Sequence, residues 1–528
     1  MKKILTYLKH SMKKCIIVLL ITFVLLGIQI LLPLFTREVL NNIQSTLSFS
    51  TVVIGLAVYA VLLLIYNIID VCWYSSLDYL GGDILGSMRT DLMTSMFYAS
   101  YKKIMQYGFE KAKNVLYMDT LSIYGCLTVQ LVNIISNGLL MMVFSVLSFF
   151  VDVRLGMVLL LVEFCSLLIS VVTRKKISGA SGAVNRVMKR NNQMLNEYVD
   201  SLETARNNYL LDYFLEKERS INTEFIGEAV KSDKYLIALK NISKHFHQWA
   251  SLLISALLIL LIQGSSGDLV YALLVLDIVL GASEGIESSI YQLMKSKPAF
   301  EYVNKINDMM EEREYASLKD VNEIRFEDVS FGYGKENIIE HLSCVFKKGD
   351  IVHIKGKNGS GKSTFIKLLT SLLQADSGNI VFDGVNVNQL DPGCLHELLV
   401  YVSQDETLLN ESFADYLRIM TEGQNSYEEI EKTIAEFSIN REDDRIENLG
   451  LSLSGGQRKK LLFAKLKLRE KKTPIIIMDE LENAMDIGMR EELEKYKQYL
   501  YKNRDKHIIF VISHEATENE FYTKELCL

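Results

Sequence analysis

The chain has 528 residues, 49% of them hydrophobic and 23% charged, which is long enough for two to four domains. Its formal net charge of -7, with no basic domain, argues against nucleic acid as the main partner. Its seven scattered cysteines form no C-x-x-C pair, so we expect reduced thiols rather than a structural zinc site.

Long apolar runs crowd the first ~300 residues. The run from Ile16 to Phe35 follows a lysine-rich start, is too long for a signal-peptide core and precedes no small-residue cleavage site, so it predicts a retained membrane helix. Further candidate spans are Val52–Trp73, Thr128–Val151, Leu155–Thr173, Phe246–Ile262 and Leu269–Ile290. Most reach the ~20 residues that cross a bilayer. Phe246–Ile262 is marginal, and a buried helix is its alternative.

The basic residues predict how these spans are oriented. The N-terminus and Arg174–Lys176 are basic, whereas the expected outer loops hold only Arg37 and Arg154. Because basic loops stay in the cytosol, the pattern predicts a multi-pass protein of the cytoplasmic membrane with both termini cytosolic. The polar segments Ser75–Leu127 and Arg174–His245 are too long for turns, so we expect helices that continue into the cytosol.

The composition changes to an ordinary soluble pattern near Ser317–Val321. We therefore expect a transmembrane domain over residues 1–316 and a second domain over residues 317–528. In the second domain, Ile324–Tyr333 predicts a strand that ends in an exposed aromatic residue, and Gly378–Gly384 predicts a hairpin strand and turn.

A glycine-rich segment, residues 356–363, matches the phosphate-binding pattern G-x-x-x-x-G-K-[ST]. Its flanks have the order that the motif needs, because Ile351–Ile354 predicts a buried strand and apolar residues recur at helical spacing from Phe365 to Leu373. The glycines let backbone N–H groups converge on phosphate oxygens, and the helix N-terminus adds partial positive charge. Lys362 would reach the β- and γ-phosphates, and the Ser363 hydroxyl would bind Mg²⁺. The nucleotide-binding candidates here are Gly356, Lys357, Asn358, Gly359, Ser360, Gly361, Lys362, Ser363 and Thr364.

A second nucleotide motif follows at Pro474–Met478, an apolar strand that ends in two carboxylates. Asp479 would orient Mg²⁺, and Glu480 would polarise the attacking water. Two solvated acids at the end of a strand are the alternative, which the phosphate loop makes improbable. These motifs predict an α/β P-loop NTPase.

Leu453-Ser454-Gly455-Gly456-Gln457 is the most specific element of the sequence. With it, the whole chain resembles the ATP-binding cassette (ABC) transporters, specifically half-transporters of the exporter type. The resemblance implies an all-α, six-helix transmembrane domain followed by one α/β cassette, with ATP and Mg²⁺ as cofactors. It also implies that Leu453, Ser454, Gly455, Gly456 and Gln457 contact ATP.

The resemblance implies roles for further residues. Glu480 falls where the family keeps its catalytic carboxylate, His514 fits the switch histidine, and Gln404 resembles the glutamine that links Mg²⁺ to the membrane domain. Tyr333 resembles the aromatic residue that stacks on adenine, and Asp486 lies where the D-loop belongs. The bends expected near Phe109–Asp119 and Glu203–Phe214 fall where exporters place their coupling helices.

In that family the signature segment of one cassette closes on the phosphate loop of another, so the resemblance implies a dimer with an identical chain or a paralogue. It implies ATP-driven export of an unidentified small molecule, peptide, lipid or amphiphile by alternating access. An ATP-dependent membrane regulator that moves no cargo is the alternative. A cassette used in translation or DNA repair is excluded by the membrane spans, and an importer is disfavoured because importers usually separate cassette and permease chains.

Acidic residues inside the apolar runs suggest the cargo path. Asp277, Gly281, Glu284 and Ser288 lie on one stripe of the last span, and Glu163 lies inside the fourth. Such acids are costly in a bilayer and face the interior or a water-filled cavity. We expect them to line a cavity that favours cationic amphiphiles; protonation or pairing with a basic residue is the alternative.

Overall fold

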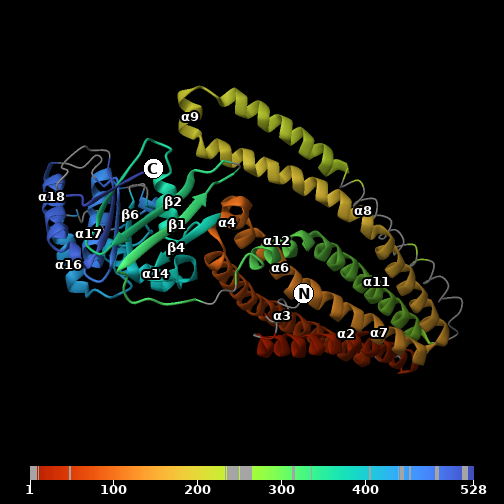
Figure 1. Ribbon diagram of the computed structural model, residues 1–528. Helices are drawn as coiled ribbons and strands as arrows, with labels where there is room; N and C mark the ends of the chain where they lie inside the picture. Colours follow the sequence, from red (N-terminus) through yellow and green to blue (C-terminus); the bar gives the residue numbers. More distant parts are fainter. Residues whose placement is uncertain are drawn as a thin grey trace. The chain divides into compact units, whose positions relative to one another are not determined.

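A computed structural model of the chain describes residues 7, 9, 11–46, 49–231, 234, 249, 252, 265–311, 315–334, 336–403, 406–437, 439, 445–450, 453–481, 487–513 and 521–528. They form two compact units (Figure 1). One unit comprises Met1–Ala99 and Gln106–Met310, and the other comprises Ser100–Met105 and Glu311–Leu528.

The first unit is helical (Figure 1). Its elements are α2 (Met12–Thr46), α3 (Phe49–Tyr98), the end of α4 (Tyr101–Tyr107), α5 (Phe109–Asn114), the π-helix η1 (Val115–Asp119), α6 (Thr120–Gly125), the π-helix η2 (Cys126–Gln130), α7 (Leu131–Val151), α8 (Val153–Asp200), α9 (Leu202–Asn207), α11 (Ser266–Lys295) and α12 (Lys297–Asn307). The residues 211–231 are also helical.

Several of these helices have the length and composition of membrane spans. Among the described residues, four stretches qualify: Met12–Ile43, Val52–Tyr98, Phe109–Val151 and Ser266–Asn307. They contain the first, second, third and sixth predicted spans. The fourth lies within α8, and nearly all of the fifth, Phe246–Ile262, lies outside the described residues. The 50 residues of α3 extend about 75 Å, well beyond a hydrocarbon core of ~30 Å.

Polar contacts fix α2 against its neighbours. Trp73 Nε1 of α3 donates to Thr22 Oγ1 of α2 at 2.8 Å inside a buried cluster. At the other end of α2, Arg37 Nε donates to Asp268 Oδ1 of α11 at 2.6 Å. Asp268 also closes a capping box with Ser265 at the start of α11. The helices approach so closely here that a Cβ on Gly267 would lie 2.5 Å from the Arg37 carbonyl oxygen, which explains the glycine.

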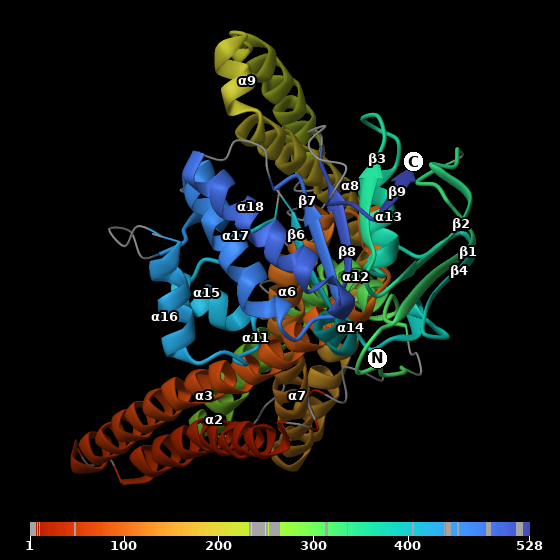
Figure 2. The same cartoon turned by 60° about the vertical axis from the view of Figure 1, so that its left-hand side comes forward.

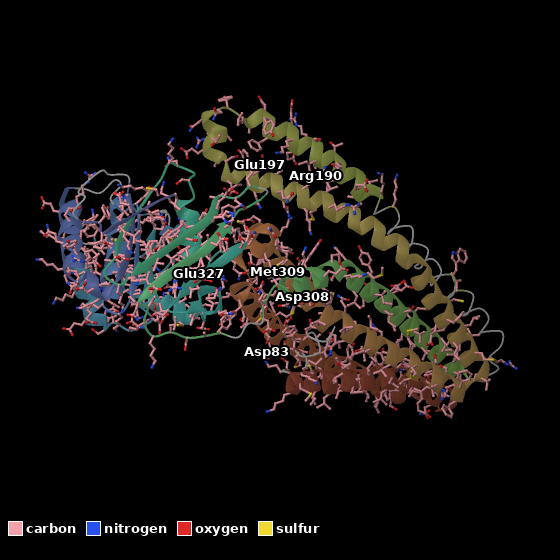
Figure 3. The ribbon with its side chains drawn as sticks, in the orientation of Figure 1. Asp83, Arg190, Glu197, Asp308, Met309 and Glu327 are labelled. Carbon is pink, nitrogen blue, oxygen red and sulfur yellow. The ribbon has the colours of Figure 1, made fainter. Side chains whose placement is uncertain are left out.

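Ion pairs stabilise the long hairpin formed by α8, α9 and residues 211–231. Arg190 and Glu197 of α8 (Figure 3) pair with Glu224 at 2.6 Å and Lys217 at 2.7 Å, respectively. The chain reverses through α9, inside the predicted bend Glu203–Phe214.

The other predicted bend, at Phe109–Asp119, is wrong. This stretch is helical, and the chain turns earlier, between the end of α3 at Tyr98 and Gly108, whose φ is 95°. Within this turn the only glycine or proline is Gly108, so the local signal in the sequence lies just before the predicted bend.

The second unit contains two sheets with helices around them (Figure 2). Its strands are β1 (Glu323–Phe331), β2 (Ile339–Lys347), β3 (Ile351–Lys355), β4 (Ser377–Phe382), β5 (Val385–Asn386), β6 (Leu399–Ser403), β7 (Ile475–Asp479), β8 (Ile508–Ile512) and β9 (Lys524–Cys527). Its helices, besides residues 101–105 of α4, are α13 (Lys362–Leu369), η3 (Val387–Gln389), α14 (Pro392–Leu398), α15 (Phe413–Met420), α16 (Tyr427–Glu436), η4 (Asn448–Gly450), α17 (Gly455–Glu470), α18 (Ile487–Lys502) and η5 (Arg504–Lys506).

One sheet is antiparallel, in the order β2-β1-β4-β5, and the other is parallel, in the order β6-β7-β8-β3-β9. The central strands β7 and β8 of the parallel sheet are almost continuous apolar runs, mainly of isoleucine, because both of their faces are buried. The predicted hairpin turn is confirmed at Asp383-Gly384, where both residues have positive φ. One feature differs from expectation, because α13 ends at Leu369 rather than near Leu373. The strand β9, close to the C-terminus, was not predicted from the sequence.

Candidate nucleotide-binding site

The parallel sheet gathers the predicted motifs at one edge, because parallel strands all end on the same side. There β3 leads into the phosphate loop, β7 ends at Asp479, β6 ends one residue before Gln404 and β8 ends two residues before His514. In the strand register, both Ile354 of β3 and Asp479 of β7 align with Ile512 of β8. The start of the phosphate loop and the carboxylate are therefore about two strand spacings, or ~10 Å, apart.

Glycines shape the phosphate loop between β3 and α13. Gly359 and Gly361 have φ values of +85° and +102°, which side-chain-bearing residues rarely adopt. A Cβ on Gly361 would also lie 2.9 Å from Ile338 Cγ2. The loop thus presents backbone rather than side chains at the N-terminus of α13, where N–H groups have no partner inside the helix.

The polar atoms of the loop fit a polyphosphate. Lys362 Nζ donates to the main-chain oxygens of Gly356 at 2.9 Å and Lys357 at 3.3 Å, so the ammonium group lies across the loop. Ser360 Oγ is buried, and it has no hydrogen-bond partner among the residues that the structure describes. Cationic and N–H donors around a helix N-terminus are what an anionic phosphate chain requires.

The two carboxylates after β7 have different environments. Tyr401 of β6 donates its hydroxyl to Asp479 Oδ2 at 3.1 Å. Glu480 has a left-handed backbone with φ of 50°, which its N–H supports by donating to the Ile512 oxygen at 3.0 Å. Such a conformation costs about 1–2 kcal/mol and often marks a functional position. Asp479 and the exposed Ser363 supply the oxygen ligands that Mg²⁺ prefers.

The predicted signature segment forms the N-terminus of α17. Ser454 Oγ accepts from the Gln457 N–H at 3.2 Å, and Gln457 Oε1 accepts from the Ser454 N–H at 3.1 Å. This capping box leaves Ser454 and Gly455 exposed, with Leu453 and Gly456 half-buried. α17 packs against β6, which is three strand spacings, about 14 Å, from β3. The fold therefore does not bring the signature segment to the phosphate loop of its own chain.

The remaining predicted residues have different outcomes. Tyr333 is exposed just after β1 and packs edge-on against Phe331, with ring centroids 5.2 Å apart. Gln404, Asp486 and His514 lie outside the described residues. Asn358 is exposed, and Thr364 is buried in the first turn of α13.

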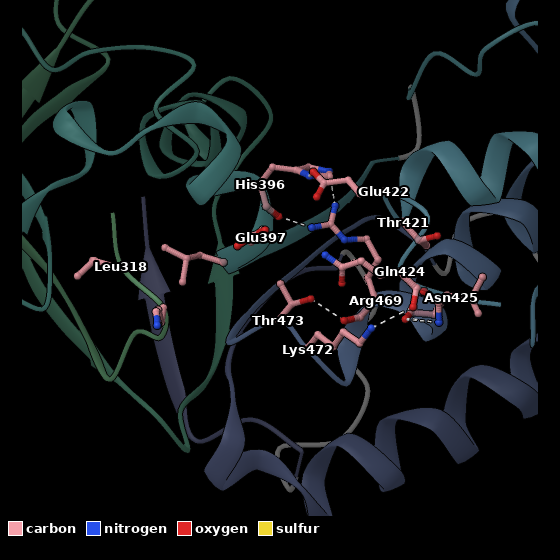
Figure 4. A pocket seen from close by; sticks show the side chains of 13 residues that line it. Leu318, His396, Glu397, Thr421, Glu422, Gln424, Asn425, Arg469, Lys472 and Thr473 are labelled. Atoms are coloured by element: carbon pink, nitrogen blue, oxygen red, sulfur yellow. Dashed lines mark hydrogen bonds and ion pairs between the residues drawn. The ribbon is translucent and has the colours of Figure 1, made fainter. Parts of the chain in front are cut away.

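A cavity of about 180 Å³ lies elsewhere in the second unit, between the ends of α14, α15 and α17 (Figure 4). Arg469 donates to His396 Nε2, and His396 Nδ1 in turn contacts Glu422. Burial, reinforced by Arg469, lowers the pKa of His396. None of the predicted nucleotide-binding residues lines this cavity.

Comparisons with known proteins agree with this site. Residues 339–483, which include the phosphate loop, the signature segment and both carboxylates, match the family model described as ABC transporter. The chain is 23% identical over 469 residues to the "ATP-dependent lipid A-core flippase" of Photorhabdus laumondii subsp. laumondii, covering 84% of this chain and 78% of the relative.

Other relatives match over less of their length. The "Beta-(1-->2)glucan export ATP-binding/permease protein NdvA" of Rhizobium johnstonii is 28% identical over 53% of this chain, and the match spans only 49% of that relative. The solved "Structure of a bacterial Atm1-family ABC exporter with ATP bound" has a TM-score of 0.83, covering 98% of this chain and 93% of that chain at 17% identity. Residues 339–483 therefore match an ABC transporter cassette, and the chain as a whole has the fold of an ABC exporter.

Proposed function

We propose that this chain is half of an ATP-driven exporter of the cytoplasmic membrane. Residues 1–316 would form a transmembrane domain with six spans and both termini cytosolic, and residues 317–528 would form the cassette. The supporting observation is that one sheet edge gathers the phosphate loop, Asp479 and Glu480 in a chain that also carries membrane-length helices.

Each residue of the site has a role in this proposal. The phosphate loop and Lys362 hold the β- and γ-phosphates of ATP, and Tyr333 stacks on adenine. Ser363 and Asp479, assisted by Gln404, would hold Mg²⁺, which when bound neutralises charge on the phosphates. Glu480 polarises the attacking water, and His514 and Asp486 complete the catalytic edge.

A second half-transporter completes the site. The separation of about 14 Å between β6 and β3 supports an arrangement in which the signature segment, Leu453–Gln457, contacts ATP held by another chain. An identical chain is the simplest partner, and a paralogue is the alternative. Binding of ATP between two cassettes would then couple cassette closure to alternation of the membrane domains.

The proposed cargo is an amphiphile, such as a lipid or a peptide. The name of the lipid A-core flippase supports a lipid, because that relative is similar over most of this chain. The β-(1→2)glucan exporter matches over too little of its length to favour its own cargo.

The test uses the full-length chain reconstituted in liposomes containing a fluorescent NBD-labelled phospholipid and a cationic dye. We expect Mg²⁺-dependent ATP hydrolysis and ATP-dependent movement of at least one probe, both abolished by Lys362→Ala. Absence of ATP binding by the wild type, measured by photolabelling with azido-ATP, would refute the proposal. Hydrolysis that moves neither probe would favour a regulatory protein, and binding without hydrolysis would favour a paralogous partner.

A further inference from the structure

A buried lysine on the signature helix holds the segment that follows β6. Lys465 is two helical turns after Arg458 on α17, and its side chain is only 7% exposed. Its Nζ donates to Glu406 Oε1 at 2.6 Å, to Glu406 Oε2 at 2.7 Å and to the Tyr401 carbonyl oxygen at 2.8 Å. All three protons of the ammonium group therefore have acceptors.

Glu406 is held from several directions. Arg458, directly after the signature segment, donates to the main-chain oxygen of Glu406. The fully buried Tyr416 of α15 donates to Glu406 Oε1 at 3.4 Å. In the sequence Glu406 is only two residues after Gln404. Arg458 and Lys465 of α17 thus donate to the main-chain oxygen and to the carboxylate of Glu406, respectively.

The same contacts extend to the Mg²⁺ side of the site. Tyr401, whose carbonyl oxygen accepts from Lys465, donates its own hydroxyl to Asp479 Oδ2 at 3.1 Å. Tyr401 therefore links α17 to the end of β7, because its main-chain oxygen accepts from Lys465 and its side-chain hydroxyl donates to Asp479.

A contribution to stability alone does not explain why Lys465 and Glu406 form a buried ion pair here. Burial lowers the pKa of Lys465, which reflects the cost of keeping this charge away from water. Replacing a buried ion pair by apolar residues of similar size is often neutral or stabilising, whereas removing one partner is costly. The specific feature of the pair is that it joins the signature helix α17 to β6 and the segment after it, and each of these carries or adjoins a predicted nucleotide-site motif.

We propose that Lys465 is a positioning residue, which fixes the signature helix to Glu406 and, through Tyr401, fixes the orientation of the Asp479 carboxylate. This inference rests on the proposed function, because it concerns the same ATPase site. Movement of the signature helix when it meets a partner cassette would then be transmitted to the carboxylate that orients Mg²⁺. Lys465 itself touches neither ATP nor Mg²⁺ in this proposal.

The first test compares Lys465→Met, Lys465→Arg and the double variant Lys465→Met/Glu406→Met in the full-length reconstituted chain. We expect Lys465→Met to lower kcat on the order of 10- to 100-fold, a typical effect of misplaced catalytic groups, with KM for ATP changed less than about twofold. Lys465→Arg should restore much of kcat because it keeps the charge. The double variant should recover the melting temperature but not kcat.

The matched control is Lys467→Met. Lys467 is on the same helix as Lys465, and its substitution breaks only an exposed ion pair with Glu436 of α16, so kcat should be unchanged. Tyr401→Phe removes only the hydroxyl next to Asp479, so it should raise the Mg²⁺ concentration needed for half-maximal activity without lowering the melting temperature. Tyr401→Phe also tests the proposal if Lys465→Met does not fold. Recovery of kcat together with stability in the double variant, or an unchanged Mg²⁺ requirement in Tyr401→Phe, would overturn the proposal.

A second measurement needs no ATP turnover. Hydrogen exchange of nucleotide-free protein should become faster in peptides containing Glu406 and the start of α17 in Lys465→Met, but not in Lys467→Met. Unchanged exchange at both places would overturn the positioning role. If the wild type is inactive but Lys465→Met still shows this faster exchange, the result counts against the proposed ATPase function and not against the positioning role. The failures of the two proposals are therefore distinguishable.

Discussion

Glu480 combines a proposed catalytic role with a strained backbone, and two substitutions separate these properties. Glu480→Gln keeps the size of the side chain and the φ of 50°, and the hydrogen bond to Ile512 is unaffected because it uses the main-chain N–H. Only the ability to polarise water is lost. Loss of a general base costs about 10²- to 10⁴-fold in rate, or about 3–5 kcal/mol of barrier.

Glu480→Gly should also be inactive, but more stable. Relief of the left-handed strain gains about 1–2 kcal/mol, and the extra freedom of glycine in the unfolded chain costs about 0.4–1 kcal/mol, which leaves about 1 kcal/mol. For a domain of this size, that raises the cassette melting temperature by about 2–4 °C. Asp328→Gly is a matched control, because exposed Asp328 also has φ of 50° and should gain stability without losing activity.

The assays are Mg²⁺-ATP hydrolysis and scanning calorimetry of the purified full-length protein. ATP binding should persist in both Glu480 variants because the phosphate loop is untouched. Hydrolysis by Glu480→Gln at a near wild-type rate would refute the catalytic assignment. A lower melting temperature for Glu480→Gly than for the wild type would refute the reasoning about strain.

Three further predictions follow from the site and the membrane helices. Mixing Lys362→Ala chains with Ser454→Arg chains should restore one complete site per mixed dimer, and mixed dimers without any ATPase activity would count against a shared site. Gly361→Ala should abolish azido-ATP photolabelling and lower the melting temperature, because alanine disfavours the φ of +102° and its Cβ would lie 2.9 Å from Ile338 Cγ2, which distorts the phosphate loop. Glu163→Gln/Asp277→Asn should lose the stimulation of ATPase activity by cationic amphiphiles relative to matched anionic ones; equal stimulation by both classes in the wild type would disprove the charge preference.

The motifs and the strands around them could be predicted from the sequence because their signals are local. The β3 strand, the phosphate loop and β7 each combine β-branched residues with glycine or acids at fixed spacing, and the structure has them at the expected places. The spacing also predicted that four residues of the last span share one face. All four are exposed on α11: Asp277, Gly281, Glu284 and Ser288. Glu163, in contrast, accepts a hydrogen bond from Ser145 at 2.6 Å, a contact that no spacing rule reveals.

The features that the sequence did not predict depend on contacts between distant segments. Lys465 looks like one of many lysines on a polar helix, and only the packing of α17 on β6 places it against Glu406, 59 residues earlier. The strand β9 is short, and it forms by pairing with β3, about 170 residues earlier. Long-range pairing of this kind overrides weak local propensity.

The contact between α2 and α11 has a consequence for biogenesis. Asp268 is synthesised 231 residues after its partner Arg37. At about 5–20 residues per second, roughly 10–50 s separate the two. During this time Arg37, which follows the first predicted span, lacks this counter-ion, so the contact that holds α2 against α11 cannot form. We therefore expect the nascent N-terminal helix to remain loosely packed, and exposed to membrane quality control, until α11 has been made.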